Sequence, residues 1–210
     1  MTSPFLHVAP DDIEATSFRM IEAELPRPLD PLTAPIVKRV IHATADFDYV
    51  DSLVFSDSAV PQALAALEQG ATIVTDTRMA QAGINQAALE RLGCASHCYM
   101  ADPETAAMAA AQGVTRASAA VDRAVELPGP LVFAVGNAPT ALVRLHQLMT
   151  AGQLNPALVV AVPVGFVNVV AAKELILAAA VPHIVNRGRK GGSTVAAAII
   201  NALLYQLARG

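Results

Sequence analysis

Short unbroken runs of apolar residues, each followed by a segment with helical spacing, most constrain what this chain can fold into. Three such runs stand in its second half, at 131–135 (LVFAV), 157–162 (ALVVAV) and 183–186 (HIVN). Continuous β-branched runs are typical of strands covered on both faces, whereas a half-exposed strand alternates apolar and polar residues. Strands that alternate with helices predict an α/β layered domain, in which a mainly parallel sheet is flanked by helices.

The same pattern extends to the first half of the chain, where strands are expected at 53–55 and 72–75. The spacing of apolar residues predicts a helix at 11–25 and a second helix that starts at about 33. A third helix follows the strand at 53–55 and ends at 70, and further helices are expected over 138–150, 168–180 and 193–208. No composition break or low-complexity linker divides the 210 residues. We therefore expect one domain over 1–210.

Composition and charge exclude several classes of protein. The chain is 54% hydrophobic and 15% charged, so it has enough apolar surface for a core and is not a disordered chain. A net charge of −4 disfavours a nucleic-acid binder, which usually has a basic footprint. The uncharged stretch 145–172 is broken by Gly, Pro and Asn, so it predicts a buried strand between two helices and not a membrane span.

Two features predict a cytoplasmic protein. Residues 1–14 turn acidic before any apolar run forms, which is unlike a signal peptide. Cys94 and Cys98 are too few for a disulfide framework, and reduced thiols are the simpler interpretation. The segment CASHC that contains them also offers too few ligands for zinc, which needs about four, so we expect no metal there.

The segments that follow the expected strands predict where a ligand binds. In open parallel sheets, ligands bind outside the carboxyl ends of the strands. The segments at that edge are rich in Gly, Pro and Asn: 75–79 (TDTRM), 136–140 (GNAPT), 163–166 (PVGF) and 186–193 (NRGRKGGS). The sequence therefore predicts the binding site at this edge of the sheet.

Three cations in the last of these segments indicate an anionic ligand. Arg187, Arg189 and Lys190 lie within four residues in a net acidic chain, and arginine suits carboxylate or phosphate groups. The alternative is a solvated turn before the last helix. The segment is not a P-loop, because Gly192 and not Lys precedes Ser193, which disfavours a nucleotide triphosphatase.

Other candidate residues have two interpretations each. Gly136 allows a tight turn or a close approach to a ligand, and Asn137 could bind or cap, but an ordinary helix start also explains both. His42, near the end of the second expected helix, suits proton exchange near neutral pH, although a lone histidine is often structural. Ser17 and Arg19 on the first helix have the same ambiguity.

Taken together, these segments resemble one family over about residues 11–205. The matching motifs, in chain order, are SFRMIEAE (17–24), RVIHATAD with His42, IVTDTRMAQAGI with Asp76 and Met79, TRASAAV with Arg116, LVFAVGNAPTAL, VAVPVGFVNVV and NRGRKGGST. This order and separation are similar to those of the precorrin-8X methylmutases, or precorrin isomerases. The combination of GNAPTAL, PVGF and RGRKGGS is the most specific part of the resemblance.

The resemblance implies an isomerase of cobalamin biosynthesis. Such an enzyme moves a methyl group from C-11 to C-12 of precorrin-8X, giving hydrogenobyrinic acid, or acts on the cobalt counterpart to give cobyrinic acid. The family's catalytic histidine maps onto His42, and no cofactor or metal is needed. The tetrapyrrole substrate would contact Ser17, Arg19, Asp76, Met79, Arg116, Gly136, Asn137, Arg187, Arg189, Lys190 and Ser193. The family works as a homodimer with the site near the interface, and no nucleic acid or membrane is implied.

One departure from the family leaves alternatives open. Many members carry an acidic residue and often a serine between PVGF and the following lysine, whereas this chain has Ala171 and Ala172 before Lys173. A non-catalytic tetrapyrrole carrier with the same fold is the main alternative, and His42 favours the enzyme because a carrier need not keep it. A generic nucleotide-binding α/β protein is a third interpretation. The motifs do not distinguish a metal-free from a cobalt-containing substrate.

Overall fold

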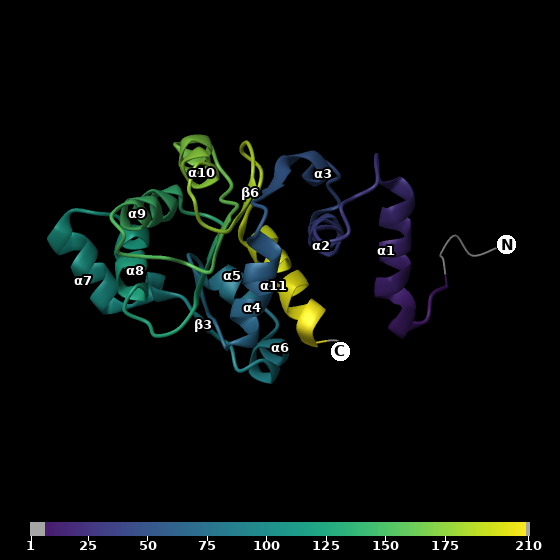
Figure 1. The fold of residues 1–210 in the computed structure, drawn as a ribbon, viewed down its shortest axis with the longest axis horizontal. Coiled ribbons are helices and arrows are strands. Elements are labelled where there is room, and N and C mark those ends of the chain that lie inside the picture. The colour runs from purple at the N-terminus through teal and green to yellow at the C-terminus, as the bar shows by residue number, and fades with distance from the viewer. Residues whose placement is uncertain (1–6, 209–210) are drawn as a thin grey trace.

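A six-stranded sheet organises the chain, and the computed structural model describes residues 7–208 of it (Figure 1). The strands are β1 (Leu53–Phe55), β2 (Thr72–Thr75), β3 (Ala95–His97), β4 (Leu131–Val135), β5 (Leu158–Ala161) and β6 (His183–Asn186). They lie in the order β1-β6-β5-β4-β2-β3, and every neighbouring pair is parallel except β1 with β6. The expected α/β class with a mainly parallel sheet is therefore confirmed. The first six residues of the segment judged unlike a signal peptide lie outside the described residues.

Helices fill the connections between these strands. They are α1 (Ile13–Glu24), α2 (Ala34–Thr44), α3 (Tyr49–Ser52), α4 (Ala59–Glu68), α5 (Arg78–Gly83), α6 (Gln86–Arg91), α7 (Pro103–Gln112), α8 (Arg116–Ala124), α9 (Pro139–Thr150), α10 (Val169–Leu177) and α11 (Ser193–Ala208), with 3₁₀ turns at Pro10–Asp12 and Tyr99–Ala101. Every strand and helix expected from the sequence is present, with ends shifted by a few residues. Strand β3, the single-turn helix α3 and helices α5 to α8 were not expected, because their short segments give no clear periodicity.

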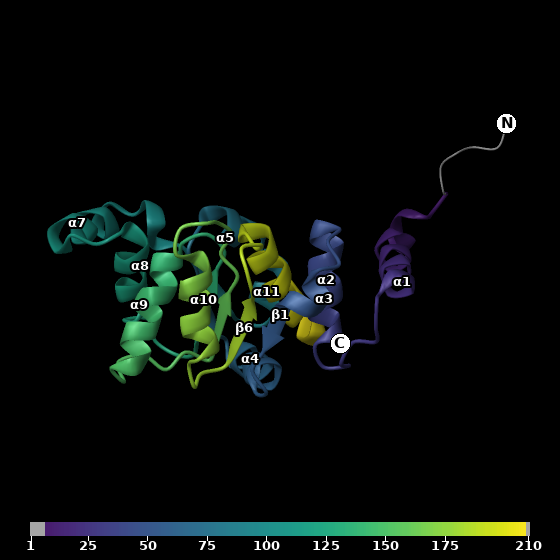
Figure 2. The same cartoon turned by 90° about the horizontal axis from the view of Figure 1, so that it is seen from above.

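Both faces of the central strands are buried, as the unbroken apolar runs predict. In β4, Val132 and Ala134 face one core cluster while Leu131, Phe133 and Val135 face the other. The first cluster contains residues of α2, α4 and α11, and the second contains residues of α8, α9 and α10. Figure 2 shows α9 and α10 on one side of β6 and α11 on the other. The uncharged stretch 145–172 thus holds the buried strand β5, as expected.

Helix α1 stands at one end of the molecule, apart from the sheet layers (Figures 1 and 2). It packs on α2, where Arg39 pairs with Glu14 and lies 4.7 Å from the Phe18 ring centroid. None of its residues is buried, and the side chains of Ile13 and Met20 are each 55% exposed. Across the described part of the chain, no helix is long and apolar enough to cross a membrane.

Candidate active site

The carboxyl ends of β2 and β4 are joined by one buried carboxylate. Asp76, directly after β2, accepts the backbone N–H groups of Gly136, Asn137 and Ala138 over 2.8, 2.7 and 2.6 Å. Burial raises the pKa of the Asp76 carboxyl, and the three amide hydrogen bonds act in the opposite direction. Both carboxylate oxygens are occupied in this way, so Asp76 fixes the shape of the turn that begins α9.

Two glycines are required where the loops after β4, β5 and β6 meet. A Cβ atom on Gly136 would lie 2.8 Å from the backbone of Gly192. Gly191 has φ +148°, and a Cβ there would overlap the carbonyl oxygen of Val162. The N–H of Gly192 donates to that same carbonyl over 2.8 Å. Close backbone contact, which only glycine permits, therefore brings these three segments to one edge.

The loop over residues 187–192, called the basic loop here, is supported from below by two buried side chains. The Lys173 ammonium donates to the carbonyl oxygens of Gly188 and Lys190, both over 2.8 Å. Asn186 Nδ2 donates to the same Lys190 carbonyl over 2.8 Å. Burial lowers the pKa of Lys173 to about 8. Both side chains are fully buried and hold the loop from its inner side, rather than facing a ligand.

The local surroundings of Lys173 show what the departure from the family pattern changes. Ala171 is exposed and Ala172 is buried in the second core cluster. Among residues 7–208, no carboxylate lies within ion-pair distance of the Lys173 ammonium. Its two hydrogen-bond acceptors are instead neutral carbonyls of the basic loop. In the sequence, the only signal that Lys173 supports the basic loop was its position as a lone lysine in an apolar helix.

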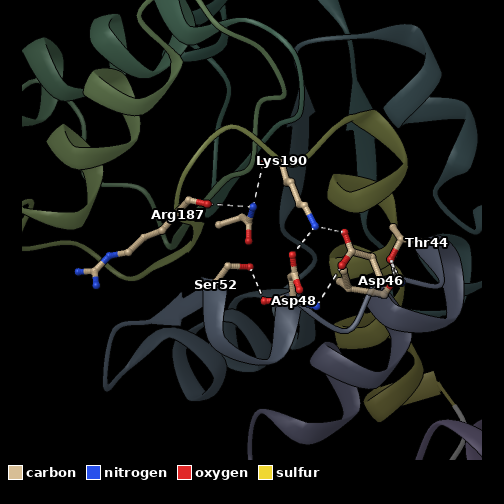
Figure 3. Close-up of polar contacts among 8 residues, drawn as sticks. Thr44, Asp46, Asp48, Ser52, Arg187 and Lys190 are labelled. Carbon is tan, nitrogen blue, oxygen red and sulfur yellow. Dashed lines mark hydrogen bonds and ion pairs between the residues drawn. The ribbon is translucent and has the colours of Figure 1, made fainter. Parts of the chain in front are cut away.

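The three cations of the basic loop differ in their partners. Arg187 and Arg189 are exposed, and the Arg189 guanidinium lies 5.2 Å from the Phe166 ring centroid. Lys190 instead bonds to the carboxylates of Asp46 and Asp48. Figure 3 shows the Arg187 side chain pointing away from this lysine–aspartate cluster. The two arginines are therefore the cations placed to receive an anionic ligand.

Large apolar side chains are exposed at the same edge. Those that follow β2 or β5 are Met79 (69% exposed), Val164 (47%), Phe166 (79%), Val167 (78%) and Val170 (39%). Val164 also lies 3.9 Å from the position of a Cβ on Gly192, so it adjoins the basic loop. Exposed apolar groups beside cations are typical of a binding surface for a ligand that is both apolar and anionic.

His42 lies in the last turn of α2, and its ring is exposed. The ring stacks on Phe18 of α1, with centroids 5.3 Å apart. Beside Phe18 on α1, the Ser17 hydroxyl donates to the Ile13 carbonyl over 2.9 Å, and the guanidinium of Arg19 donates to Thr16 over 2.8 Å. The hydrogen bonds of Ser17 and Arg19 thus stay within α1, and Phe18 is the residue of this helix that contacts His42.

Two further residues predicted to contact the substrate, Arg116 and Ser193, are the first residues of helices that begin at the same edge. Thr77, which caps α5, shares a 2.7 Å hydrogen bond with Ser193 at the start of α11. Arg116 is exposed at the start of α8, where Thr115 bonds to Thr140 of the segment 136–140 over 2.9 Å. The structure therefore brings the predicted residues of the main sheet edge together, while Ser17 and Arg19 lie on the separate helix α1.

Among the described residues, no group of three or more potential metal ligands is found. The CASHC segment is part of the sheet and its packing. Its middle residues form β3, which pairs with β2. The thiol of Cys94 lies 3.3 Å from the Leu67 carbonyl, and the ring of His97 stacks on Tyr99 with centroids 5.8 Å apart.

The fold and this edge define an α/β protein with a broad apolar and cationic surface at the carboxyl ends of its parallel strands. The sequence pattern of the family described as precorrin-8X methylmutase matches residues 12–206. The chain therefore belongs to the precorrin-8X methylmutase family.

Individual relatives and a solved structure agree with this assignment. The chain is 46% identical to a cobalt-precorrin-8 methylmutase of Salmonella typhimurium, covering 94% of this chain and 96% of that protein. It is 39% identical to a precorrin-8X methylmutase of Pseudomonas aeruginosa, covering 89% and 91%. A crystal structure of a precorrin-8X methylmutase from Thermus thermophilus superposes with a TM-score of 0.86 at 43% identity, covering 94% of this chain and 98% of that one.

Proposed function

We propose that this chain is the isomerase that moves a methyl group from C-11 to C-12 of the precorrin-8X macrocycle, or of its cobalt counterpart, in cobalamin biosynthesis. Family membership over residues 12–206 is the observation that carries the activity. The migration is intramolecular, because one carbon–carbon bond breaks and another forms within the same molecule. The enzyme's contribution is then acid–base help and a fixed shape of the ring.

The carboxyl edge of the sheet suits such a substrate. The macrocycle is a large, mostly apolar disc with carboxylates on its rim. The exposed side chains of Val164, Phe166 and Val167 offer an apolar surface, and the Arg189 guanidinium lies 5.2 Å from the Phe166 ring centroid. Arg187 is exposed in the same loop as Arg189. Arginine pairs with carboxylates through two parallel hydrogen bonds, which fixes the orientation of the disc as well as its affinity.

His42 is the residue proposed to exchange a proton with the macrocycle. Its ring is exposed in the last turn of α2, and imidazole gains and loses a proton near neutral pH. Further substrate contacts are proposed for Ser17, Arg19, Met79, Arg116, Asn137 and Ser193. Asp76 and Gly136 are proposed to act through the shape of the turn before α9.

We also propose a single domain, a homodimer and a cytoplasmic location. The family match, which spans almost the whole chain, supports the single domain. The dimer is supported by α1, a helix with no buried residue that exposes Ile13 and Met20. A second copy that covers this helix would place His42 near the interface, because Phe18 of α1 stacks on it.

Turnover with substrate in excess tests the proposed activity. Purified protein is mixed with precorrin-8X, and separately with cobalt-precorrin-8, and the absorption spectrum is followed. Conversion of many equivalents per chain is expected for an isomerase, whereas a carrier stops at one equivalent. The substrate with the higher kcat/KM is then the preferred one. A precursor spectrum that persists with both substrates would contradict the proposal.

A further inference from the structure

Lys190 is held by two carboxylates from a distant part of the chain. Its ammonium donates to Asp46 Oδ2 over 2.7 Å and to Asp48 Oδ2 over 2.6 Å, as Figure 3 shows. These partners are separated from it by 144 and 142 residues in sequence. Both aspartates lie in the short connection between α2 and α3. The bridge therefore ties the basic loop to the end of the helix that carries His42.

The backbone of Lys190 is also fixed. Its carbonyl oxygen accepts hydrogen bonds from the buried side chains of Lys173 and Asn186, each over 2.8 Å. Arg187, which precedes it in the same loop, is anchored through its N–H, which donates to the Ser52 carbonyl over 2.8 Å, while its side chain points elsewhere (Figure 3). Lys190 is thus fixed at both its backbone and its side chain.

The connection from the bridge back to His42 is short and internally bonded. Ala45 ends α2 with φ +53°, and its N–H donates to the Ile41 carbonyl over 2.7 Å. The Thr44 hydroxyl donates to the Val40 carbonyl over 2.8 Å and accepts the N–H of Asp46 over 3.3 Å. Movement of Asp46 would therefore be transmitted to the last turn of α2.

Electrostatics oppose the use of Lys190 as a substrate ligand. A carboxylate on the substrate would have to compete with two carboxylates already bound, and Asp46 and Asp48 would repel it. The lysine lowers the pKa of Asp46 through their hydrogen bond, and the two aspartates raise the pKa of Lys190. Among the residues described, neither Arg187 nor Arg189 forms an ion pair, so both remain open to a ligand.

We propose that Lys190 is a positioning residue for the isomerisation: it clamps the basic loop to the end of α2 and so sets the position of His42 relative to the substrate. This proposal rests on the proposed function, and it replaces the direct substrate contact expected from the sequence. Because a small misplacement of a reacting group slows a reaction without much loss of binding, the clamp should act on kcat.

A double-mutant cycle tests the clamp. The variants are Lys190→Met, the pair Asp46→Asn with Asp48→Asn, and all three together, with kcat and KM measured for each. We expect kcat to fall by about 10- to 100-fold in the lysine variant and similarly in the aspartate pair, with KM nearly unchanged. The triple variant should be no slower than either, because all remove the same bridge. Lys190→Arg, which keeps the charge, should recover much of the rate.

Arg187→Ala serves as the matched control, because it removes a cation of the same loop that is outside the clamp. It should raise KM. If Lys190→Met also raises KM while kcat is unchanged, Lys190 is a substrate ligand and the clamp is wrong. Additive losses of rate in the triple variant, or wild-type kinetics in all variants, would equally overturn it.

A second measurement separates this proposal from the proposed function. Amide hydrogen exchange is compared between wild type and Lys190→Met, without substrate. Faster exchange in both 41–46 and 187–192 is expected if the bridge couples these segments. Unchanged exchange in either segment overturns the clamp whether or not the protein turns over. A wild-type protein that fails to convert either substrate would contradict the proposed function instead.

Discussion

The ring of His42 stacks on the ring of Phe18, with centroids 5.3 Å apart and an angle of 20° between the planes. This contact joins the last turn of α2 to α1, which otherwise stands apart from the sheet layers (Figure 2). Within residues 7–208, no hydrogen bond to the His42 ring is found. Because the residue is exposed, its ring nitrogens are open to solvent or to a ligand, as the proposed proton exchange requires.

Replacing His42 with Asn should lower kcat by about 10²- to 10⁴-fold while binding of the macrocycle is retained. Asparagine keeps polarity but cannot titrate near neutral pH. Because the ring is exposed, the melting temperature should change little. Turnover, binding and melting are measured on the same samples. His146→Asn, in a pocket beside residues 178–181 that precede β6, is the matched control and should keep the wild-type rate. A folded His42→Asn protein with wild-type kcat would remove the catalytic role.

Replacing Arg187 or Arg189 with Ala should weaken macrocycle binding by about 1–3 kcal/mol, as expected for one charge-assisted contact. Both side chains are exposed, so no large loss of stability is expected. Fluorescence or absorbance titrations at low and high salt measure the effect. Salt should weaken wild-type binding more than binding by either variant, since each variant has one charge contact fewer. Equal affinity in wild type and both variants would leave the basic loop as a solvated turn.

Replacing Asp76 with Asn should lower the free energy of unfolding by about 1–3 kcal/mol, because at least one buried amide N–H then lacks an acceptor. The carboxylate accepts three such groups, at Gly136, Asn137 and Ala138, and the amide side chain of asparagine has only one oxygen. Urea unfolding measures the loss. Asp57→Asn, at an exposed position, is the control and should be neutral. Equal stability of the two variants would show that Asp76 does not hold the turn.

Lys173 should make the stability of the protein depend on pH in alkaline solution. Burial lowers its pKa from 10.5 to about 8, so between these values the unfolded chain binds a proton that the folded chain lacks. The contribution of Lys173 to the free energy of unfolding therefore rises with pH across this window, by at most about 1.4 kcal/mol per pH unit.

The variant Lys173→Met isolates this effect. The difference in unfolding free energy between wild type and variant should increase from pH 8 to pH 10. Between pH 6 and pH 7 the same difference should stay constant, which serves as the internal control. Chemical unfolding at each pH provides the values. A difference that does not rise above pH 8 would show that burial does not lower the pKa of Lys173.

Light scattering at micromolar concentration should give twice the chain mass of 21.8 kDa. If α1 takes part in the dimer, replacing both Ile13 and Met20 with Ser should raise the dimer dissociation constant at least about tenfold. Both side chains are exposed in the single chain, and the variant would lose the apolar area that they bury when the dimer forms. Analytical ultracentrifugation over a dilution series measures that constant. A fully active protein of monomeric mass would contradict the proposed dimer.

The sequence by itself determined the elements and the edge where the site lies. The runs at 131–135, 157–162 and 183–186 became β4, β5 and β6, because a continuous apolar run is a local signal that both faces of a strand are covered. The glycine-rich segments after these strands meet at one edge, since parallel neighbours place their carboxyl ends together. Family motifs added the activity and the candidate role of His42.

Only the tertiary structure decided which residues hold one another. Periodicity gave no sign that β1 runs antiparallel to β6, or that the segment 95–97 forms an edge strand. Asp76 and Lys190 were both expected to touch the substrate, yet their charged groups are bound to the chain itself, at 136–138 and at 46–48. The reason is physical: a local pattern records whether a residue is buried or exposed, whereas its partner is set by the order of the strands, which brings together residues far apart in sequence.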